Sequence, residues 1–231
     1  MYFLVCVVNS AHADRALLLS RLQYYFDSRD FNTINLTVLV PKLPYRFHLF
    51  GYTNLHGRQG RGGQRFDVRE TFSEYRLSNY TLGDQLGVDG LHFFAEANYR
   101  SPGRTSIGRA GVGVKRKVEG FALFVDRPPQ FTLRLVPLET DGDGGQLSSN
   151  YLIPLHQRIH LSGFADYNLA SSGSHAWVDE AQLNVKLFDP VSLVLEFRHN
   201  GFLAGVPRKR STGWAPGCLL YTSDAADEEA W

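Results

Sequence analysis

Residues 159–169, IHLSGFADYNL, set the fold class, because apolar and polar side chains alternate along them. Ile159, Leu161 and the other odd positions share one face of an extended chain, and this face is apolar. His160, Asp166 and the other even positions share the opposite face, which is mostly polar. Successive side chains of a β-strand point to opposite sides, so this stretch predicts a strand with one apolar and one mostly polar face.

The same period of two recurs along most of the chain. We count about eleven alternating segments, near residues 31–40, 45–55, 66–80, 91–100, 106–118, 120–126, 130–139, 149–155, 158–169, 177–188 and 191–202. Several are about ten residues long, which is the length of a tilted strand that crosses a bilayer and exceeds the usual strand of a soluble sheet. Turn-forming stretches rich in Gly, Pro, Asp and Ser separate the segments. The sequence therefore predicts an all-β protein, with no helix beyond a possible turn at residues 16–23.

The two ends of the chain depart from this pattern. MYFLVCVV and the following NSAHA resemble the end of a secretory signal peptide, because Ala11 and Ala13 give the small-residue spacing of a cleavage site. We expect residues 1–13 to be a signal-peptide remnant, with a buried first strand as the alternative. CLLYTSDAADE at residues 218–228 resembles the translation of a DNA adapter used in sequencing libraries, so we expect residues 218–231 not to be native. Both cysteines lie in these ends, so a chain trimmed at both would have no disulfide.

Two architectures fit alternating strands in an exported chain. A soluble sandwich or small barrel would turn its apolar face inward, whereas an outer-membrane barrel would turn it outward to lipid. The apolar faces are rich in Leu, Val and Ala, with aromatic residues such as Tyr99 and Trp177 toward the segment ends. This distribution favours a lipid-facing band bordered by aromatic girdles. The polar faces carry charges of both signs, among them Glu96, Arg109, Arg134, Asp166, Glu180, Lys186, Glu196 and Arg198.

From residue 31 to about 217, the chain resembles a Gram-negative outer-membrane β-barrel protein of porin-like type. The resemblance implies a single antiparallel transmembrane β-barrel over residues 14–217, with about twelve strands. Eleven visible segments and a closing C-terminal strand, beginning near Gly213 and truncated by residues 218–231, give the even number that bacterial barrels have. The early connections fall out of phase with the later alternation of long and short ones, which indicates a miscounted segment between residues 106 and 139.

The function expected from this resemblance is a passive channel in the outer membrane for small polar or anionic solutes. The eight charged residues named above would line the pore and set its charge preference. We expect no catalytic residue, metal site or cofactor, and no nucleic-acid partner; the partners would be the lipid bilayer, lipopolysaccharide and a small polar solute. Three alternatives stay open: a plugged structural or adhesive barrel, a soluble periplasmic β-protein, and an outer-membrane lipid hydrolase. The hydrolase would use His199 as its base, but no serine follows this histidine closely.

Overall fold

The computed structural model describes residues 18–29, 31–58, 67–102, 106–119, 127–140, 144–170, 173, 175–204 and 211–221. These residues form one helix, α1 (Thr81–Leu86), two 3₁₀ turns, η1 (Pro44–Arg46) and η2 (Gly201–Leu203), and twelve strands. In the described part of the chain, no helix combines the length and the apolar character needed to cross a membrane. The strands are β1 (Leu18–Asp27), β2 (Phe31–Leu43), β3 (Phe47–Arg58), β4 (Val68–Asn79), β5 (Leu91–Ser101), β6 (Ile107–Lys117), β7 (Gln130–Glu139), β8 (Gly144–His156), β9 (Ile159–Ala170), β10 (His175–Phe188), β11 (Val191–Asn200) and β12 (Thr212–Tyr221).

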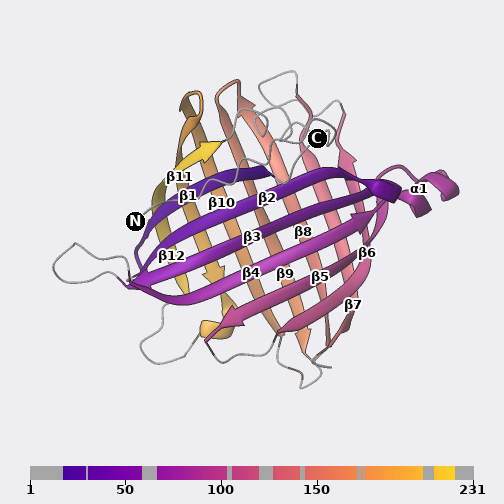
Figure 1. Ribbon diagram of the computed structural model, residues 1–231, viewed down its shortest axis with the longest axis horizontal. Helices are drawn as coiled ribbons and strands as arrows, with labels where there is room; N and C mark the ends of the chain where they lie inside the picture. The colour runs from indigo at the N-terminus through magenta and orange to yellow at the C-terminus, as the bar shows by residue number, and fades with distance from the viewer. Residues whose placement is uncertain are drawn as a thin grey trace.

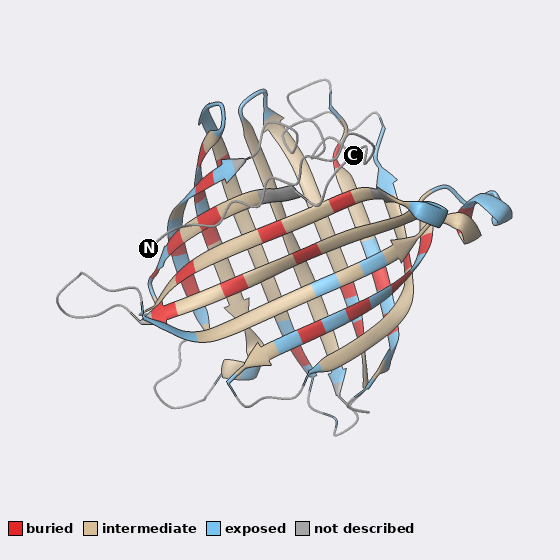
Figure 2. Ribbon diagram, in the orientation of Figure 1, coloured by how far each residue is buried: buried red, intermediate tan, exposed pale blue. Residues whose placement is uncertain are grey.

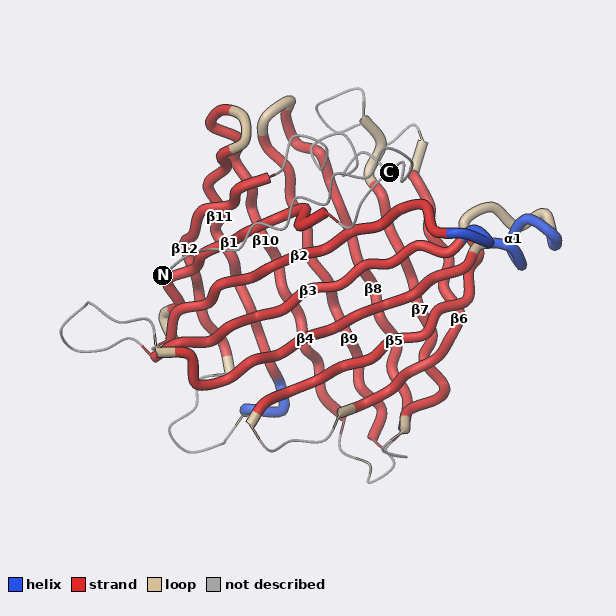
Figure 3. The backbone as a smooth tube through the Cα atoms, in the orientation of Figure 1, coloured by secondary structure: helices blue, strands red, loops and turns tan. Residues whose placement is uncertain are grey.

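The twelve strands form a closed antiparallel barrel in which each strand pairs with its neighbours in the sequence (Figure 1). β12 closes the wall by pairing with β1, so that Tyr25 lies opposite Gly217 and Arg21 lies opposite Tyr221. The tube in Figure 3 shows this continuous wall, with α1 projecting from one end. Closure leaves no unpaired strand edge. The predicted single antiparallel barrel of about twelve strands is confirmed.

Ten of the eleven predicted segments coincide with β2 to β11. The remaining segment, 120–126, lies outside the described residues, and β6 pairs directly with β7, so the wall has no place for a strand between them. Without this segment, the short connection 44–46 falls at the same end as 157–158 and 189–190, and the long connection 59–67 falls at the same end as 201–211, although the long connections 80–90 and 118–129 interrupt the alternation. The possible helical turn predicted at residues 16–23 is wrong, because Leu18–Asp27 form the strand β1, which pairs with β2 with a register shift between Leu19 and Arg21.

The last strand extends beyond the predicted domain boundary at Gly217. Residues 218–221 continue β12: 218–220 pair with both β1 and β11, with Leu219 opposite Gln23 on one side and Ser192 on the other, and Tyr221 pairs with β1. In this chain, the residues that resemble an adapter therefore complete the barrel wall. Their non-native origin and the signal-peptide boundary after residue 13 stay predictions, and residues 1–17 and 222–231 lie outside the described part.

The two faces of the wall have opposite character. Along β5, His92, Phe94, Glu96 and Asn98 are buried, while the residues between them are exposed. Figure 2 shows the same alternation of buried and less buried positions on the front strands. On β11, the outward Leu193 and Leu195 keep 46% and 43% of their surface exposed. An apolar outside around a polar inside is the arrangement of a membrane barrel and reverses that of a soluble protein.

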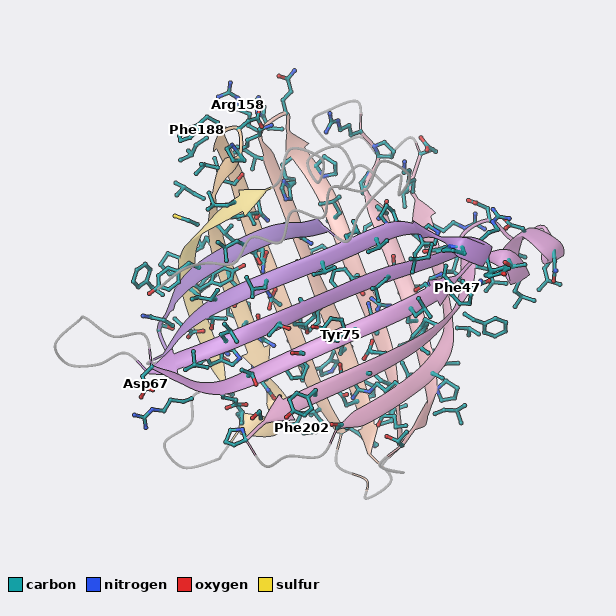
Figure 4. All side chains as sticks on the ribbon, in the orientation of Figure 1. Phe47, Asp67, Tyr75, Arg158, Phe188 and Phe202 are labelled. Carbon is teal, nitrogen blue, oxygen red and sulfur yellow. The ribbon has the colours of Figure 1, made fainter. Side chains whose placement is uncertain are left out.

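The two ends of the barrel differ in their connections. At one end, which we call the terminal end, β1 begins, β12 ends, and turns of two residues join β8 to β9 and β10 to β11. The opposite, loop end carries the connections 59–67 and 201–211. In Figure 4, Asp67 and Phe202 lie at the loop end, and Phe47 and Phe188 lie at the terminal end.

Aromatic side chains ring the outer wall near both ends. At the loop end, Tyr167 packs on Trp177 and Phe197 packs on Trp214, with ring centroids 4.9 and 4.8 Å apart. Large exposed aromatic residues at the loop end are Tyr99, Trp177, Phe202 and Trp214. Those at the terminal end include Phe93 and Phe188. The tyrosine and tryptophan rings at the loop end are amphipathic and match a bilayer interface, and the phenylalanines add apolar rings near the other end of the wall.

Candidate functional site

The barrel encloses a cavity of about 450 Å³ that is lined by inward-facing side chains. Its lining extends from Arg29, in the β1–β2 connection at the loop end, to Lys115 and Gln130 near the terminal end. Most of the lining side chains are polar or charged, because each strand turns its polar face inward. The cavity therefore extends along much of the barrel.

One row of alternating charge crosses four neighbouring strands. Arg76 of β4, Glu96 of β5, Arg109 of β6 and Glu139 of β7 lie directly opposite one another in register. Arg76 donates to Glu96 Oε2 from Nε at 2.8 Å and from Nη2 at 2.5 Å, and also to Glu74 Oε1 at 2.6 Å. Arg109 donates to Glu139 Oε1 at 2.6 Å and to Glu96 Oε1 at 3.4 Å. In this set of five residues, the Glu96 network, every charged side chain has a partner of opposite charge, and pairs of this kind on adjacent strands stabilise a sheet.

A second group of charges lies on β10 and β11. Glu180 is opposite Arg198 in register and its Oε2 lies 3.6 Å from Arg198 Nη1. Gln182 links this pair to the neighbouring residues, because its amide nitrogen lies 2.7 Å from Glu180 Oε1, 3.2 Å from Glu196 Oε2 and 3.0 Å from the Tyr25 hydroxyl. At the loop end, Arg29 forms an ion pair with Asp27. These contacts fix the charged side chains against the wall.

A third group, on β7 to β9, is organised differently. Arg134, Ser148 and Asp166 lie opposite one another in register, and Asn150 is the next inward residue along β8. All four line the cavity, and we call them the polar shelf. Within the described residues, neither Arg134 nor Asp166 forms an ion pair. Arg134 instead lies with its guanidinium 5.9 Å from the centroid of the Phe94 ring.

The structure places the eight predicted residues as follows. Six line the cavity: Glu96, Arg134, Asp166, Glu180, Glu196 and Arg198. Arg109 lies on the inner wall within the Glu96 network but is not among the cavity-lining residues. Lys186 lies at the terminal end, 43% exposed, in an ion pair with Asp189 of the adjacent turn. Whether these residues act on a passing solute stays a prediction.

Sequence reasoning did not name Glu74 and Arg76, which hold the Glu96 network together. The signal was present in ETFSEYR at residues 70–76, where the charged residues 70, 74 and 76 all share one strand face. Segment 66–80 was recognised as a strand, but its two faces were not separated. Tyr52 of β3, whose hydroxyl lies 3.3 Å from Glu74 Oε2, was missed for the same reason.

His199, the base of the alternative lipid hydrolase, lies on the outer wall near the loop end. Its Nδ1 lies 3.0 Å from the hydroxyl of Thr212, so its described partner is a threonine and not a serine. The adjacent Asn200 accepts a hydrogen bond from the backbone of Phe202 at 3.1 Å and caps η2. In the described ranges, no three His, Cys, Asp or Glu side chains gather to hold a metal ion.

A closed antiparallel wall that is apolar outside and charged inside defines a porin-like outer-membrane β-barrel, the class expected from the sequence. Two similar solved structures are a KdgM porin, with a TM-score of 0.55 over 87% of this chain and 99% of that chain, and a "KdgM porin in complex with disordered oligogalacturonate", with a TM-score of 0.54 over 88% and 98%. Both are 13% identical to this chain, which shows a shared fold. No protein-family model matches the sequence, and no curated protein is significantly similar to it.

Proposed function

We propose that this protein is a passive channel in the outer membrane of a Gram-negative bacterium and conducts small polar or anionic solutes. The observation that carries the proposal is the cavity along the barrel axis, enclosed by a complete wall and lined by charged and polar side chains. Such side chains replace part of the hydration of a solute, so a polar molecule enters at a lower cost than in an apolar pore. Passive conduction requires no catalytic group and no cofactor, so we propose a non-enzymatic protein.

The solute class follows from the charges of the cavity and is supported by the shared fold. Six Arg or Lys side chains and five Asp or Glu side chains line the cavity, so the lining is nearly balanced with a small basic excess. One of the similar porins is described in complex with oligogalacturonate, which is an acidic oligosaccharide. A small basic excess favours anions over cations while leaving neutral polar solutes free to pass.

The bilayer and lipopolysaccharide are the proposed partners of the outer wall. Exposed leucines and the two aromatic belts would contact acyl chains and interfaces, respectively. Bacterial barrels keep short turns on the periplasmic side and longer loops outside. Three of the five connections at the terminal end have at most three residues, although 80–90 and 118–129 are long, whereas five of the six at the loop end have four or more. On this balance, we propose that the terminal end faces the periplasm and the loop end faces the cell surface, where lipopolysaccharide lies.

A plugged structural barrel is the competing function, because the barrel has only twelve strands and many long polar side chains point into its cavity. Single-channel conductance of the refolded protein in planar bilayers separates the two. A channel gives discrete conductance steps, and Thr132→Trp, which adds bulk inside the cavity, lowers each step. The matched control is Leu133→Trp on the same strand, because Leu133 is exposed on the outer face. Failure to detect steps, or equal effects of the two variants, would refute the channel.

A further inference from the structure

The polar shelf differs from the other charged groups of the interior because, within the described residues, its two charges form no ion pair and each also leaves a buried polar atom without a hydrogen-bond partner. The side chain of Arg134 is only 4% exposed, and its Nε has no hydrogen-bond partner in the described structure. The buried Oδ1 atoms of Asp166 and Asn150 also lack a partner there. A buried polar atom without a partner costs free energy, so three of them together on one stretch of wall require an explanation.

The register explains why these two charges do not reach each other. Arg134 lies opposite Ser148, and Ser148 lies opposite Asp166, so β8 separates the strands that carry the two charges. Neighbouring strands are about 4.8 Å apart, which puts the backbones of Arg134 and Asp166 about 10 Å from each other. Arg134 also shares the Phe94 ring with Arg76, whose guanidinium lies 5.8 Å from the ring centroid, so Arg134 is held toward β5 and away from Asp166.

We infer that the polar shelf is a binding site for a small zwitterion, namely a free amino acid, on its way through the proposed channel. The carboxylate of the amino acid pairs with the Arg134 guanidinium, and its ammonium group pairs with Asp166. Ser148, whose hydroxyl hydrogen-bonds to the side chain of Asp166, lies between these two residues, and Asn150, the next inward residue of β8, offers its amide to the bound molecule. This inference rests on the proposed channel and specifies which polar solutes the channel prefers.

The other solute classes fit the polar shelf less well. A simple anion satisfies Arg134 but meets the carboxylate of Asp166, which repels it. A neutral polar molecule offers hydrogen bonds but leaves both charges uncompensated. A zwitterion alone supplies an opposite charge to each residue, and hydrogen bonds between charged groups are the stronger ones. The Glu96 network offers no comparable site, because each of its charges already has a partner.

The test uses three labelled solutes of nearly equal size, alanine, lactamide and lactate, which are zwitterionic, neutral and anionic. Each is loaded into vesicles that contain the refolded full chain, and its rate of efflux is measured. In the unmodified protein, alanine should leave about three to ten times faster than the other two solutes, the size expected for charge-assisted contacts in a partly hydrated site. The rate for each variant is expressed as the ratio of alanine to lactamide, which cancels differences in the amount of folded protein.

Arg134→Gln and Asp166→Asn should each bring the ratio of alanine to lactamide close to one. Exchanging the charges, with Arg134→Asp and Asp166→Arg in one chain, should restore the preference, because an amino acid can bind in the reverse orientation. Arg69→Gln and Asp67→Asn are the matched controls, since these two residues form an exposed ion pair at the loop end, and they should keep the ratio of the unmodified protein.

Three results would overturn the inference. Equal efflux of alanine and lactamide from the unmodified protein would show that no zwitterion is preferred. Faster efflux of lactate that depends on Arg134 alone would identify a simple anion site, and fastest efflux of lactamide would identify a site for neutral solutes. If none of the three solutes leaves the vesicles, the proposed channel itself fails and the inference falls with it.

Discussion

Replacing Glu96 by Gln tests the central electrostatic feature of the interior. The carboxylate of Glu96 is 4% exposed and accepts hydrogen bonds from Arg76 at 2.5 and 2.8 Å, from Arg109 at 3.4 Å and from Asn98 at 3.0 Å. Removing one partner of a buried ion pair costs about 3–5 kcal/mol, because the remaining charge stays buried. The amide keeps one acceptor oxygen, and both arginines keep a second carboxylate, so we expect the lower limit, about 3 kcal/mol.

The assay is urea-induced unfolding of the refolded barrel in lipid vesicles, followed by tryptophan fluorescence and by the change in gel mobility on unfolding. The matched control is Glu70→Gln, because Glu70 pairs with Arg100 at 3.4 Å while both side chains are 40% exposed or more. An exposed pair contributes less than about 1 kcal/mol, so the control should unfold almost like the unmodified protein. Loss of a negative charge inside the cavity should also shift the reversal potential in a salt gradient toward anion selectivity. Equal stabilities of the two variants would refute the buried-pair reasoning, and a shift toward cations would refute the assignment of Glu96 to the conducting path.

Three further substitutions test the wall itself. Leu195 lies in the middle of β11 and faces outward, so Leu195→Arg should destabilise the barrel in vesicles by about 2–4 kcal/mol. Trp214→Arg, nearer the end of the wall, should destabilise the barrel by less than half as much. Equal losses of stability in an unfolding titration would argue against a lipid-facing wall. Leu219→Ala should cost about 2–5 kcal/mol, since Leu219 is completely buried and its truncation leaves a cavity, and an unchanged urea midpoint would contradict the placement of β12. Gly111→Ala should cost about 1–3 kcal/mol because the added Cβ would lie 2.0 Å from the carbonyl oxygen of Leu135, and a neutral effect on the same midpoint would show that β6 and β7 pack less closely than described.

The position of β1 shows where sequence reasoning reached its limit for the fold. Its inner residues from Arg21 onward alternate with outer ones as regularly as those of the recognised strands. Residues 16–23 were instead interpreted as a possible helical turn, and the register shift between Leu19 and Arg21 becomes apparent only in the pairing of β1 with β2. Segment 120–126 is the converse case: its alternation predicted a separate strand, but β6 and β7 pair directly, so no strand lies between them in the wall.

The sequence by itself determined that this protein is all-β, which side chains share a face on most strands, and that charges lie on the face opposite the leucines. It could do so because alternation along a strand is a local property that depends only on neighbouring residues. Only the tertiary structure decided which charges meet. Glu96 pairs with Arg76 and Arg109, whereas Arg134 and Asp166 form no ion pair with any described residue, because register and strand order decide which residues far apart in the chain meet. Closure of the wall by β1 and β12 is likewise a pairing between the two ends of the barrel sequence, and no local pattern specifies it.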